Sequence, residues 1–310
     1  MLNVNHILFP TDFSECAEHA FAQASHLARH YDAVLHVLNI VVARPEDPDN
    51  PMTYLQEMEP GGPSDDADEE CRDENGLCVV HAQEVAFTEA RGILDYAERQ
   101  EVDLIVMGTH GRRGLGRLLL GSMAEKVVRL ASVPVLTVCQ TTEAGGARSI
   151  RRVLVPIDFS ESTPSALTHA KELAAVYDAR LDLLHVITEI ALPGVYGLEQ
   201  VSVAEPGVQE RVREAMTDLV EQNPGAEVAF TIHVLVGYPA HDIAEFATEH
   251  DIDLIVIATH GRTGLKRLFM GSVAENVVRQ ACCPVFTMKS FGKSLLLGNE
   301  AEMAQPAEGV

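Results

Sequence analysis

Residues 103–122 read DLIVMGTHGRRGLGRLLLGS, and residues 253–272 read DLIVIATHGRTGLKRLFMGS. In each stretch a short apolar run precedes a glycine-rich loop, and a Gly-Ser pair then opens an amphipathic segment. A buried strand that leads through such a loop into a helix is typical of an α/β protein with a parallel sheet. The stretch therefore predicts the fold class, and its second occurrence predicts that the fold is built twice.

The rest of the chain repeats in the same order. The segment ILFPTDFSE at 7–15 returns as VLVPIDFSE at 153–161, and Tyr31-Asp32-Ala33 returns as Tyr177-Asp178-Ala179. Such similarity at a fixed offset indicates a duplication. The polar, Gly-containing segment at 141–149 suits a linker. We therefore expect a first domain at 1–140, a second at 150–289 and a C-terminal tail at 290–310.

Each copy alternates short apolar runs with segments of helical periodicity. In the second copy we expect strands at 153–156, 180–187, 227–236, 253–258 and 284–288. We expect helices at 162–177, 205–221, 240–250 and 272–280. This order predicts two tandem doubly wound α/β domains, each with a five-stranded parallel sheet covered by helices on both faces. The last strands, 134–138 and 284–288, are apolar edges that need cover, so we expect the two domains to pack as an intramolecular pseudo-dimer.

Residues 43–78 break the symmetry between the copies. This segment holds five prolines, paired glycines and many acidic residues, where the second copy has a helical pattern. Proline and dense like charge oppose a regular helix. We expect a mobile acidic loop, with any helical turn confined to the neighbourhood of 52–58.

The composition limits the classes of partner. The formal charge is −23, and only five of the 23 basic residues are lysines. Nucleic acid is excluded as a general partner because phosphate binding needs clustered cations. The sequence has no run of about 18 apolar residues, so it predicts no membrane span. The N-terminus lacks signal-peptide features, and we therefore expect a cytoplasmic protein. The six cysteines show no disulfide framework.

The glycine-rich loop suits a phosphate ligand. Gly108 and Gly111 allow close approach of backbone to a ligand, Gly121-Ser122 opens a helix whose free N–H groups favour an anion, and Arg112 could reach phosphate oxygens. A purely structural alternative is that Ser122 and Glu125 form a capping box. The loop is neither a P-loop nor a dinucleotide fingerprint, since no Gly-Lys-Ser/Thr closes it and it does not follow the first strand.

A second candidate element is Pro10-Thr11-Asp12-Phe13-Ser14, which follows the first strand. Asp12 could accept hydrogen bonds from an adenine or a ribose, or it could only fix the turn into the next helix with Ser14 as the cap. In open α/β sheets, ligands bind at the carboxyl ends of strands where the strand order reverses. Both loops would face one crevice if the first and fourth strands are neighbours.

The combination of ILFPTDFSE, DLIVMGTHG and the G-x2-G-x9-G-S spacing, present twice, resembles the universal stress protein family. The resemblance covers nearly all of 5–140 and 150–289. It implies strand order 3-2-1-4-5, edge strands that pair between subunits, and ATP, carried with Mg²⁺, held between the loops after strands one and four. The implied contacts in the first copy are Pro10, Thr11, Asp12, Ile40, Met107, Gly108, His110, Gly111, Gly121, Ser122 and Met123. Those in the second copy are Pro156, Ile157, Asp158, Val186, Ile257, Gly261, Gly271, Ser272 and Val273. To these we add the loop arginines Arg112 and Arg262 as candidate phosphate contacts.

Both copies depart from the family pattern. Ala258 replaces the first motif glycine in the second copy, where its methyl group could crowd the ribose. The first copy has Phe87-Thr88-Glu89-Ala90 where the second has Gly237-Tyr238-Pro239-Ala240, the G-x-P sequence usual in the family. We rank the first copy slightly ahead as a nucleotide site.

Other constellations are weaker. Cys71, Cys78 and His81 could ligate zinc, but their spacing is not a standard one, and free surface thiols are the favoured interpretation. His110 and His260 have no evident nucleophile or second acid beside them.

The sequence favours a stress-response or regulatory protein that binds ATP without efficient hydrolysis. One alternative is a nucleotide hydrolase or transferase that uses the same pocket, with at most slow ATPase activity. The other is a structural dimerisation module with empty clefts. A homodimer of two chains is a further possible assembly.

The acidic, lysine-poor composition is that of a halophilic protein, or of an ordinary acidic protein with one acidic insert. If it is a saline adaptation, the melting temperature should rise markedly between dilute and molar KCl, because screening reduces repulsion among carboxylates. Calorimetric scans across that range test this. A melting temperature that stays flat would contradict the saline adaptation.

Overall fold

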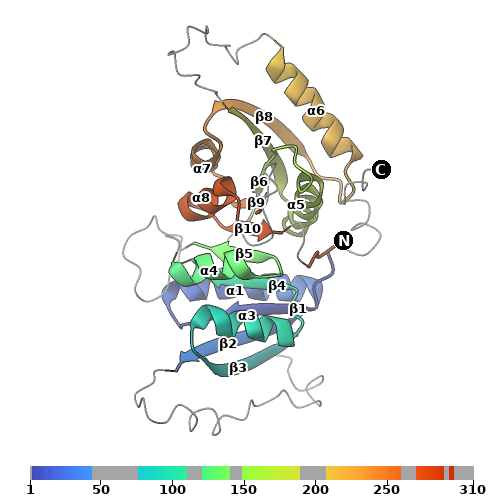
Figure 1. The fold of residues 1–310 in the computed structure, drawn as a ribbon. Coiled ribbons are helices and arrows are strands. Elements are labelled where there is room, and N and C mark those ends of the chain that lie inside the picture. Colours follow the sequence, from blue (N-terminus) through green and yellow to red (C-terminus); the bar gives the residue numbers. More distant parts are fainter. Residues whose placement is uncertain are drawn as a thin grey trace, which may run out of the picture.

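The computed structural model describes residues 2–43, 76–109, 121–139, 149–188, 207–259, 270–289 and 293–296. Within these residues, strands and helices alternate through two similar halves (Figure 1). The first half contains β1 (His6–Pro10), α1 (Glu15–Tyr31), β2 (Val34–Val42), β3 (Val79–Ala86), α3 (Glu89–Arg99), β4 (Leu104–Gly108), α4 (Ser122–Leu130) and β5 (Val135–Val138). The second half contains β6 (Arg152–Pro156), α5 (Thr163–Tyr177), β7 (Arg180–Thr188), α6 (Val208–Gln222), β8 (Phe230–Gly237), α7 (Pro239–Glu249), β9 (Leu254–Ala258), α8 (Ser272–Gln280) and β10 (Val285–Met288).

The expected elements of the second half are confirmed, with shifted starts for two of them. α6 begins at Val208 rather than 205, and β8 at Phe230 rather than 227. Gly207 and Gly225 have φ angles of 101° and 122°. Glycine adopts this left-handed backbone readily; Gly207 is the N-cap of α6, and Gly225 lies in the irregular stretch between α6 and β8. The acidic segment at 43–78 lies outside the described residues except for residue 43 and residues 76–78.

All ten strands belong to one sheet. Its order is β3-β2-β1-β4-β5-β10-β9-β6-β7-β8, so each half has the expected order 3-2-1-4-5. Strands within each half are parallel, whereas β5 and β10 pair antiparallel, with Phe286 opposite Leu136. Thr137 and Thr287 each donate a side-chain hydrogen bond to a carbonyl of the other strand, at 3.2 and 3.1 Å. The prediction that the two domains pack together through their last strands is confirmed.

The antiparallel join also determines on which edge of the joint sheet the strands of each half end. In an antiparallel pair, the carboxyl end of one strand lies beside the amino end of the other. The carboxyl ends of β1 and β4 therefore point to one long edge of the joint sheet, and those of β6 and β9 point to the opposite edge. Any ligand sites at these carboxyl ends are separate.

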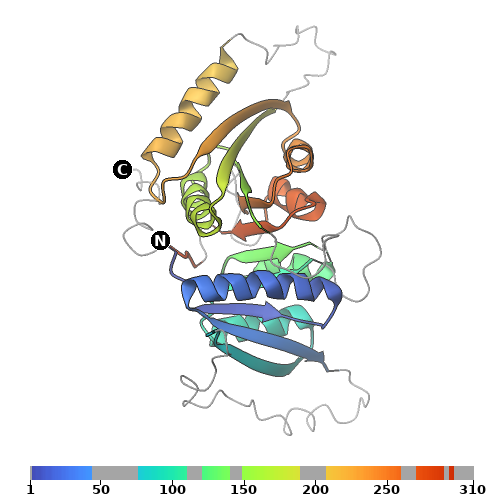
Figure 2. The same ribbon diagram turned by 180° about the vertical axis from the view of Figure 1, so that it is seen from behind.

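Helices cover both faces of the sheet. The α3–α4 pair and the α7–α8 pair cover one face, while α1, α5 and α6 cover the other (Figures 1 and 2). On the latter face one apolar cluster includes residues of α1, α5 and both sets of strands, so the core is continuous across the join. There Tyr177 of α5 stacks on His26 of α1 with ring centroids 4.9 Å apart. None of the helices in the described residues is long and apolar enough to span a bilayer.

Part of the expected C-terminal tail packs against both halves. Residues 293–296 return to the first half, where the Lys293 backbone N–H donates to the Ser132 carbonyl at 2.7 Å and its ammonium lies 2.6 Å from Asp103. The Asn3 N–H donates to the Leu295 carbonyl at 2.6 Å, and the Leu295 N–H donates to His169 of α5 at 3.4 Å. The Leu295 side chain is 1% exposed. This segment thus ties the N-terminus, α5 and the turn after α4 together.

Leu295→Ala should lower the free energy of unfolding by about 2–5 kcal/mol, because it removes a buried side chain and leaves a cavity. Urea unfolding measures the loss. Leu130→Ala is the matched control, since Leu130 is 49% exposed and its truncation should cost under about 1 kcal/mol. Equal effects of the two substitutions would show that the tail segment is not packed as described.

Candidate functional site

The carboxyl ends of β1 and β4 lie side by side at one edge of the first half. β1 pairs in parallel with β4 on one side and with β2 on the other, which is the point where the strand order reverses. The second half repeats this arrangement with β6, β9 and β7. Crevices at such reversal points are the usual ligand sites of open α/β sheets.

Pro10, Thr11 and Asp12 form the turn between β1 and α1. The Thr11 N–H donates to the Leu38 carbonyl of β2 at 2.8 Å. Asp12 Oδ1 accepts from the Ser14 N–H at 3.1 Å, and Ser14 Oγ accepts from the Ala17 N–H at 3.4 Å as the N-cap of α1. Asp12 therefore does fix the turn into the helix, as the structural alternative required, and Ser14 is the cap.

The second half builds the same turn with Pro156, Ile157 and Asp158. Asp158 Oδ1 accepts from the Ser160 N–H at 3.0 Å and from the Thr163 hydroxyl at 2.8 Å. α5 begins at Thr163, two aligned positions later than α1. The carboxylate thus shapes the turn in both halves.

Phe13 and Phe159 adopt left-handed backbone at equivalent places in these turns. Their φ angles are 59° and 56°, and both side chains are exposed. A non-glycine residue in this region costs of order 1–3 kcal/mol and persists where surrounding contacts hold it. Strain repeated at the carboxyl edge of both halves is a feature that often accompanies a functional site.

The backbone of Ile40 points to the side of β2 on which β1 lies, at a level beyond the last residue of β1. Carbonyls of alternate residues in a strand point the same way, and the Leu38 carbonyl accepts from Thr11 on the β1 side. The Ile40 backbone, two residues on, therefore points to that side, beyond the end of β1 at Pro10. Val186 has the same relation to Leu184, whose carbonyl accepts from the Ile157 N–H at 2.8 Å.

At the end of β4, Met107 is fully buried and Gly108 packs against α1. A Cβ atom added at Gly108 would lie 3.0 Å from Cys16 Sγ and 3.2 Å from the Cys16 carbonyl oxygen. In the second half the corresponding pair is Ala258, after the buried Ile257, and Ser162. The second half thus pairs a larger residue at the first position with a smaller one at the second, and Ala258 packs against the apolar cluster that contains α5 residues.

The start of α4 differs from the expected capping box. Gly121, not Ser122, is the N-cap, and no side chain caps the helix. The Gly121 N–H donates to the Thr109 carbonyl at 2.8 Å, and the Gly121 carbonyl accepts the first helical bond, from the Glu125 N–H. This tertiary bond to Thr109 fixes the cap one residue earlier than the sequence pattern suggested. α8 repeats it, with Gly271 bonded to Thr259 at 2.6 Å.

Four of the predicted nucleotide contacts are the first two residues of α4 and of α8. Ser122 and Ser272 are exposed first residues of α4 and α8, and Met123 and Val273 follow them half-buried. Five predicted residues lie outside the described residues: His110, Gly111, Arg112, Gly261 and Arg262. Within the described residues, the end of β4 lies beside the end of β1 and is bonded through Thr109 to the start of α4, and the second half repeats this with Thr259 and α8.

Comparison with known proteins assigns the family. The model of the universal stress protein family matches residues 3–138 and 149–289. The chain belongs to the universal stress protein family. A universal stress protein of Methanocaldococcus jannaschii is 33% identical over 147 residues, which are 46% of this chain and 85% of the relative. Another, from Mycolicibacterium smegmatis, is 28% identical over 64% of this chain and 65% of its own length.

A solved structure supports the tandem arrangement of the fold. The crystal structure of a universal stress protein from Archaeoglobus fulgidus matches with a TM-score of 0.63 at 22% identity, and covers 92% of this chain and 98% of its own. At this identity the likeness concerns the fold alone. This chain is thus a tandem family member whose two universal stress protein domains form one sheet.

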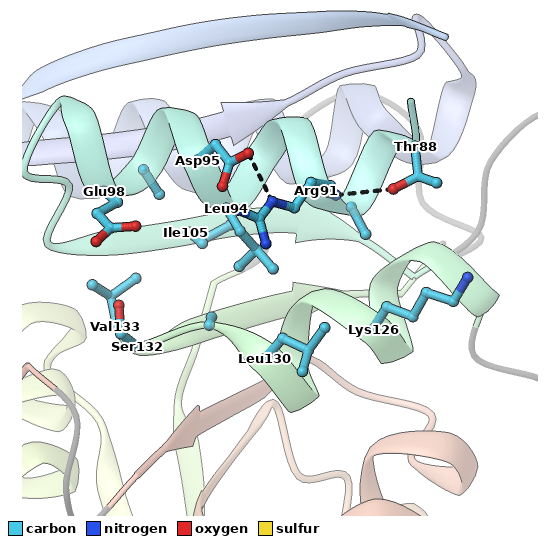
Figure 3. Close-up of a pocket in the computed structure, with 13 residues that line it drawn as sticks. Thr88, Arg91, Leu94, Asp95, Glu98, Ile105, Lys126, Leu130, Ser132 and Val133 are labelled. Atoms are coloured by element: carbon cyan, nitrogen blue, oxygen red, sulfur yellow. Dashed lines mark hydrogen bonds and ion pairs between the residues drawn. The ribbon is translucent and has the colours of Figure 1, made fainter. Parts of the chain in front are cut away.

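A cavity of about 560 Å³ lies elsewhere, between α3 and α4 (Figure 3). Leu94, Ile105 and Leu130 supply apolar walls, and Arg91 pairs with Asp95 at 2.8 Å along one side. None of its lining residues is a predicted nucleotide contact. Because part of the predicted site, 110–120, lies outside the described residues, the position of this cavity does not weigh against that site.

Two buried polar clusters were not predicted from the sequence. In the first half, His6 Nδ1 lies 3.1 Å from His36 Nε2, and His36 Nδ1 lies 3.0 Å from the Tyr96 hydroxyl. Burial lowers the pKa of His36 to about 4. In the second half, Asp182 pairs with Arg152 and His233, both at 2.9 Å. Both clusters tie the first two strands of a half together near their amino ends, away from the predicted site, and no local motif marks them.

Two observations concern metal ligands. Cys78 is disulfide-bonded, so the expectation of a free thiol there is wrong, and Cys78 has no thiolate to offer zinc. Among the described residues, His241, Asp242 and Glu245 have ligand atoms within 4.8 Å of one another. Two of these three side chains are exposed, and exposed groups of this kind are common on acidic surfaces.

The Gly108–Cys16 contact can be tested by exchanging it for the second-half pair. Gly108→Ala should cost about 1–3 kcal/mol of stability through overpacking, and Cys16→Ser in the same chain should recover part of that loss. Urea unfolding of the wild type, both single variants and the double variant gives the coupling energy, which should be at least about 0.5 kcal/mol. Strictly additive effects would show that the two residues do not oppose each other.

Proposed function

We propose that this chain is a stress-response or regulatory protein that binds an adenine nucleotide, ATP with Mg²⁺, at the carboxyl edge of each half without efficient hydrolysis. The observation that carries the proposal is the meeting of the β1 turn and the α4 start at the strand-order reversal, repeated by β6 and α8. Membership of the family supports it.

The start of α4 fits a phosphate group. The Gly121 N–H is already bonded to Thr109, so the donors that remain are those of the first helical turn, at Ser122, Met123 and Ala124, which helix geometry leaves unpaired. These N–H groups and the positive end of the helix dipole stabilise an anion. Gly121 has φ −60° and ψ 142°, which any residue can adopt. Backbone conformation does not require glycine here, which favours close approach of a ligand as the reason for it.

The opposite wall fits an adenosine moiety. The Ile40 backbone points past the end of β1, as argued above, and offers donor and acceptor groups to a base edge. Asp12 lies in the turn after β1 and can accept hydrogen bonds from ribose hydroxyls. Arg112 and Arg262 would add cationic contacts to the phosphates.

Mg²⁺ would accompany the nucleotide rather than occupy a protein cage, since this ion prefers substrate phosphates with few carboxylates. The net charge of −23 opposes the binding of a polyanion, so Mg²⁺ and added salt should raise the affinity for ATP.

The catalytic alternatives, a hydrolase or a transferase, would need a water-activating or nucleophilic residue at this edge, and the described residues suggest no candidate. The structural alternative, a dimerisation module with empty clefts, predicts no binding at all. We place the protein in the cytoplasm.

Calorimetry of the nucleotide-free chain tests the proposal. ATP should bind with higher affinity than GTP, and Gly121→Val should abolish binding in the first half because its side chain fills the approach to the helix. Gly271→Val is the matched variant in the second half, and the double variant should give no heat. Urea unfolding of Gly121→Val should resemble that of the wild type, because valine tolerates this backbone. A wild-type chain that gives no heat of binding would leave only the empty-cleft module.

The role of Asp12 can be separated from its role in the turn. Asp12→Ala should weaken ATP binding about 5- to 30-fold, corresponding to about 1–2 kcal/mol. Asp12→Asn keeps an oxygen that can accept from the Ser14 N–H while it removes the charge. If Asp12 contacts ribose, the asparagine variant should bind more weakly than wild type in calorimetry while its unfolding midpoint stays unchanged. Wild-type affinity in both variants would remove Asp12 from the site.

A further inference from the structure

The turn after β1 is held by a side chain from β2. Asn39 Nδ2 donates to the Thr11 carbonyl at 2.9 Å, and Gln83 of β3 donates to Asn39 Oδ1 at 3.2 Å. Asn39 and Gln83 are direct partners in the β2–β3 register. The Asn39 amide is thus oriented from one side and fixes the Thr11 carbonyl on the other.

The second half solves the same problem with a different residue. His185, 146 positions after Asn39, lies 2.6 Å through its Nδ1 from the Ile157 carbonyl. Because a carbonyl only accepts, Nδ1 carries the proton in this bond. The imidazole also packs against Phe159, with ring centroids 5.1 Å apart. An amide and an imidazole therefore hold equivalent carbonyls in the two halves.

Asn39 and His185 each bond the backbone two residues before the left-handed residue of the turn. The Thr11 peptide donates to Leu38 and accepts from Asn39, so both of its polar groups are fixed to β2. Phe13, two residues on, has the left-handed backbone. Such a conformation persists only where the surrounding contacts over-determine it. The same pair of bonds precedes Phe159 in the second half.

We propose that Asn39, supported by Gln83, and His185 are positioning residues, which hold the turn after the first strand of each half in the shape that receives the nucleotide. The proposal rests on the proposed function. These residues act through Thr11 and Ile157, the backbone that flanks Asp12 and Asp158. Two unlike side chains that bond the same carbonyl indicate that the position of the carbonyl matters, rather than the identity of either side chain.

The experiment uses the full chain with Gly271→Val, so that only the first half binds. In that chain, Asn39→Leu removes the donor at nearly constant volume, and Asn39→His supplies the second-half anchor. Asn5→Leu, just before the other end of β1, removes an amide that is exposed and, among the described residues, bonds only Asn3 at 3.5 Å through its side chain, and it is the control for an asparagine-to-leucine change as such. ATP affinity by calorimetry should fall about tenfold in Asn39→Leu and recover to within about threefold of the parent in Asn39→His. Gln83→Ala should give a smaller loss, and Asn5→Leu should give none.

Hydrogen exchange of the nucleotide-free chain separates the anchor from the ligand. Amides of the turn, including those of Thr11 and Ser14, should exchange at least about tenfold faster in Asn39→Leu and at the parent rate in Asn39→His. Unchanged exchange in Asn39→Leu would overturn the anchor whether or not ATP binds. Faster exchange with unchanged ATP affinity would show an anchor with no role in binding, and would overturn the proposal. A parent chain that exchanges as expected but binds no ATP would instead contradict the proposed function, and the positioning role with it.

Discussion

The antiparallel pairing of β5 with β10 is the constraint on which the rest of the structure depends. Each half alone would end in a short apolar edge strand, which is a surface that proteins must cover. Pairing the two edges removes both and merges ten strands into one sheet. It also turns one half against the other, so that the carboxyl edges face opposite sides. The duplication therefore supplies two separate candidate sites on one sheet.

The two halves keep the backbone arrangement at the carboxyl edge while they change some of the residues that build it. Asn39 and His185 anchor equivalent carbonyls, and the Gly108–Cys16 pair is replaced by Ala258 and Ser162. The Gly121 and Gly271 caps, in contrast, are retained with the same tertiary bond. A feature that survives where its neighbours are exchanged is more informative about function than the overall similarity of the halves. In this protein that feature is the start of the helix after the glycine-rich loop.

The sequence was sufficient to predict the element order and the duplication, because apolar periodicity and internal repeats are visible in the residues themselves. Apolar last strands indicated that the two halves cover each other, and the family resemblance added the pairing of these edges and the strand order. Sequence reasoning missed the details that depend on contacts between distant segments. The bond from Gly121 to Thr109 moves the cap away from Ser122, and the return of Lys293 and Leu295 ties the tail to both halves. No local pattern contains either contact, since the partners are brought together only by the finished fold.

The central claim is that the edge where β1 and β4 meet is a nucleotide site. Native mass spectrometry of the folded chain, titrated with ATP and Mg²⁺, tests it most directly. The account predicts a species heavier by the mass of at least one Mg²⁺-ATP, and its absence when Gly121→Val and Gly271→Val are combined. A folded wild-type chain that never gains the mass of a nucleotide would contradict the account, and so would a double variant that gains it as readily as the wild type.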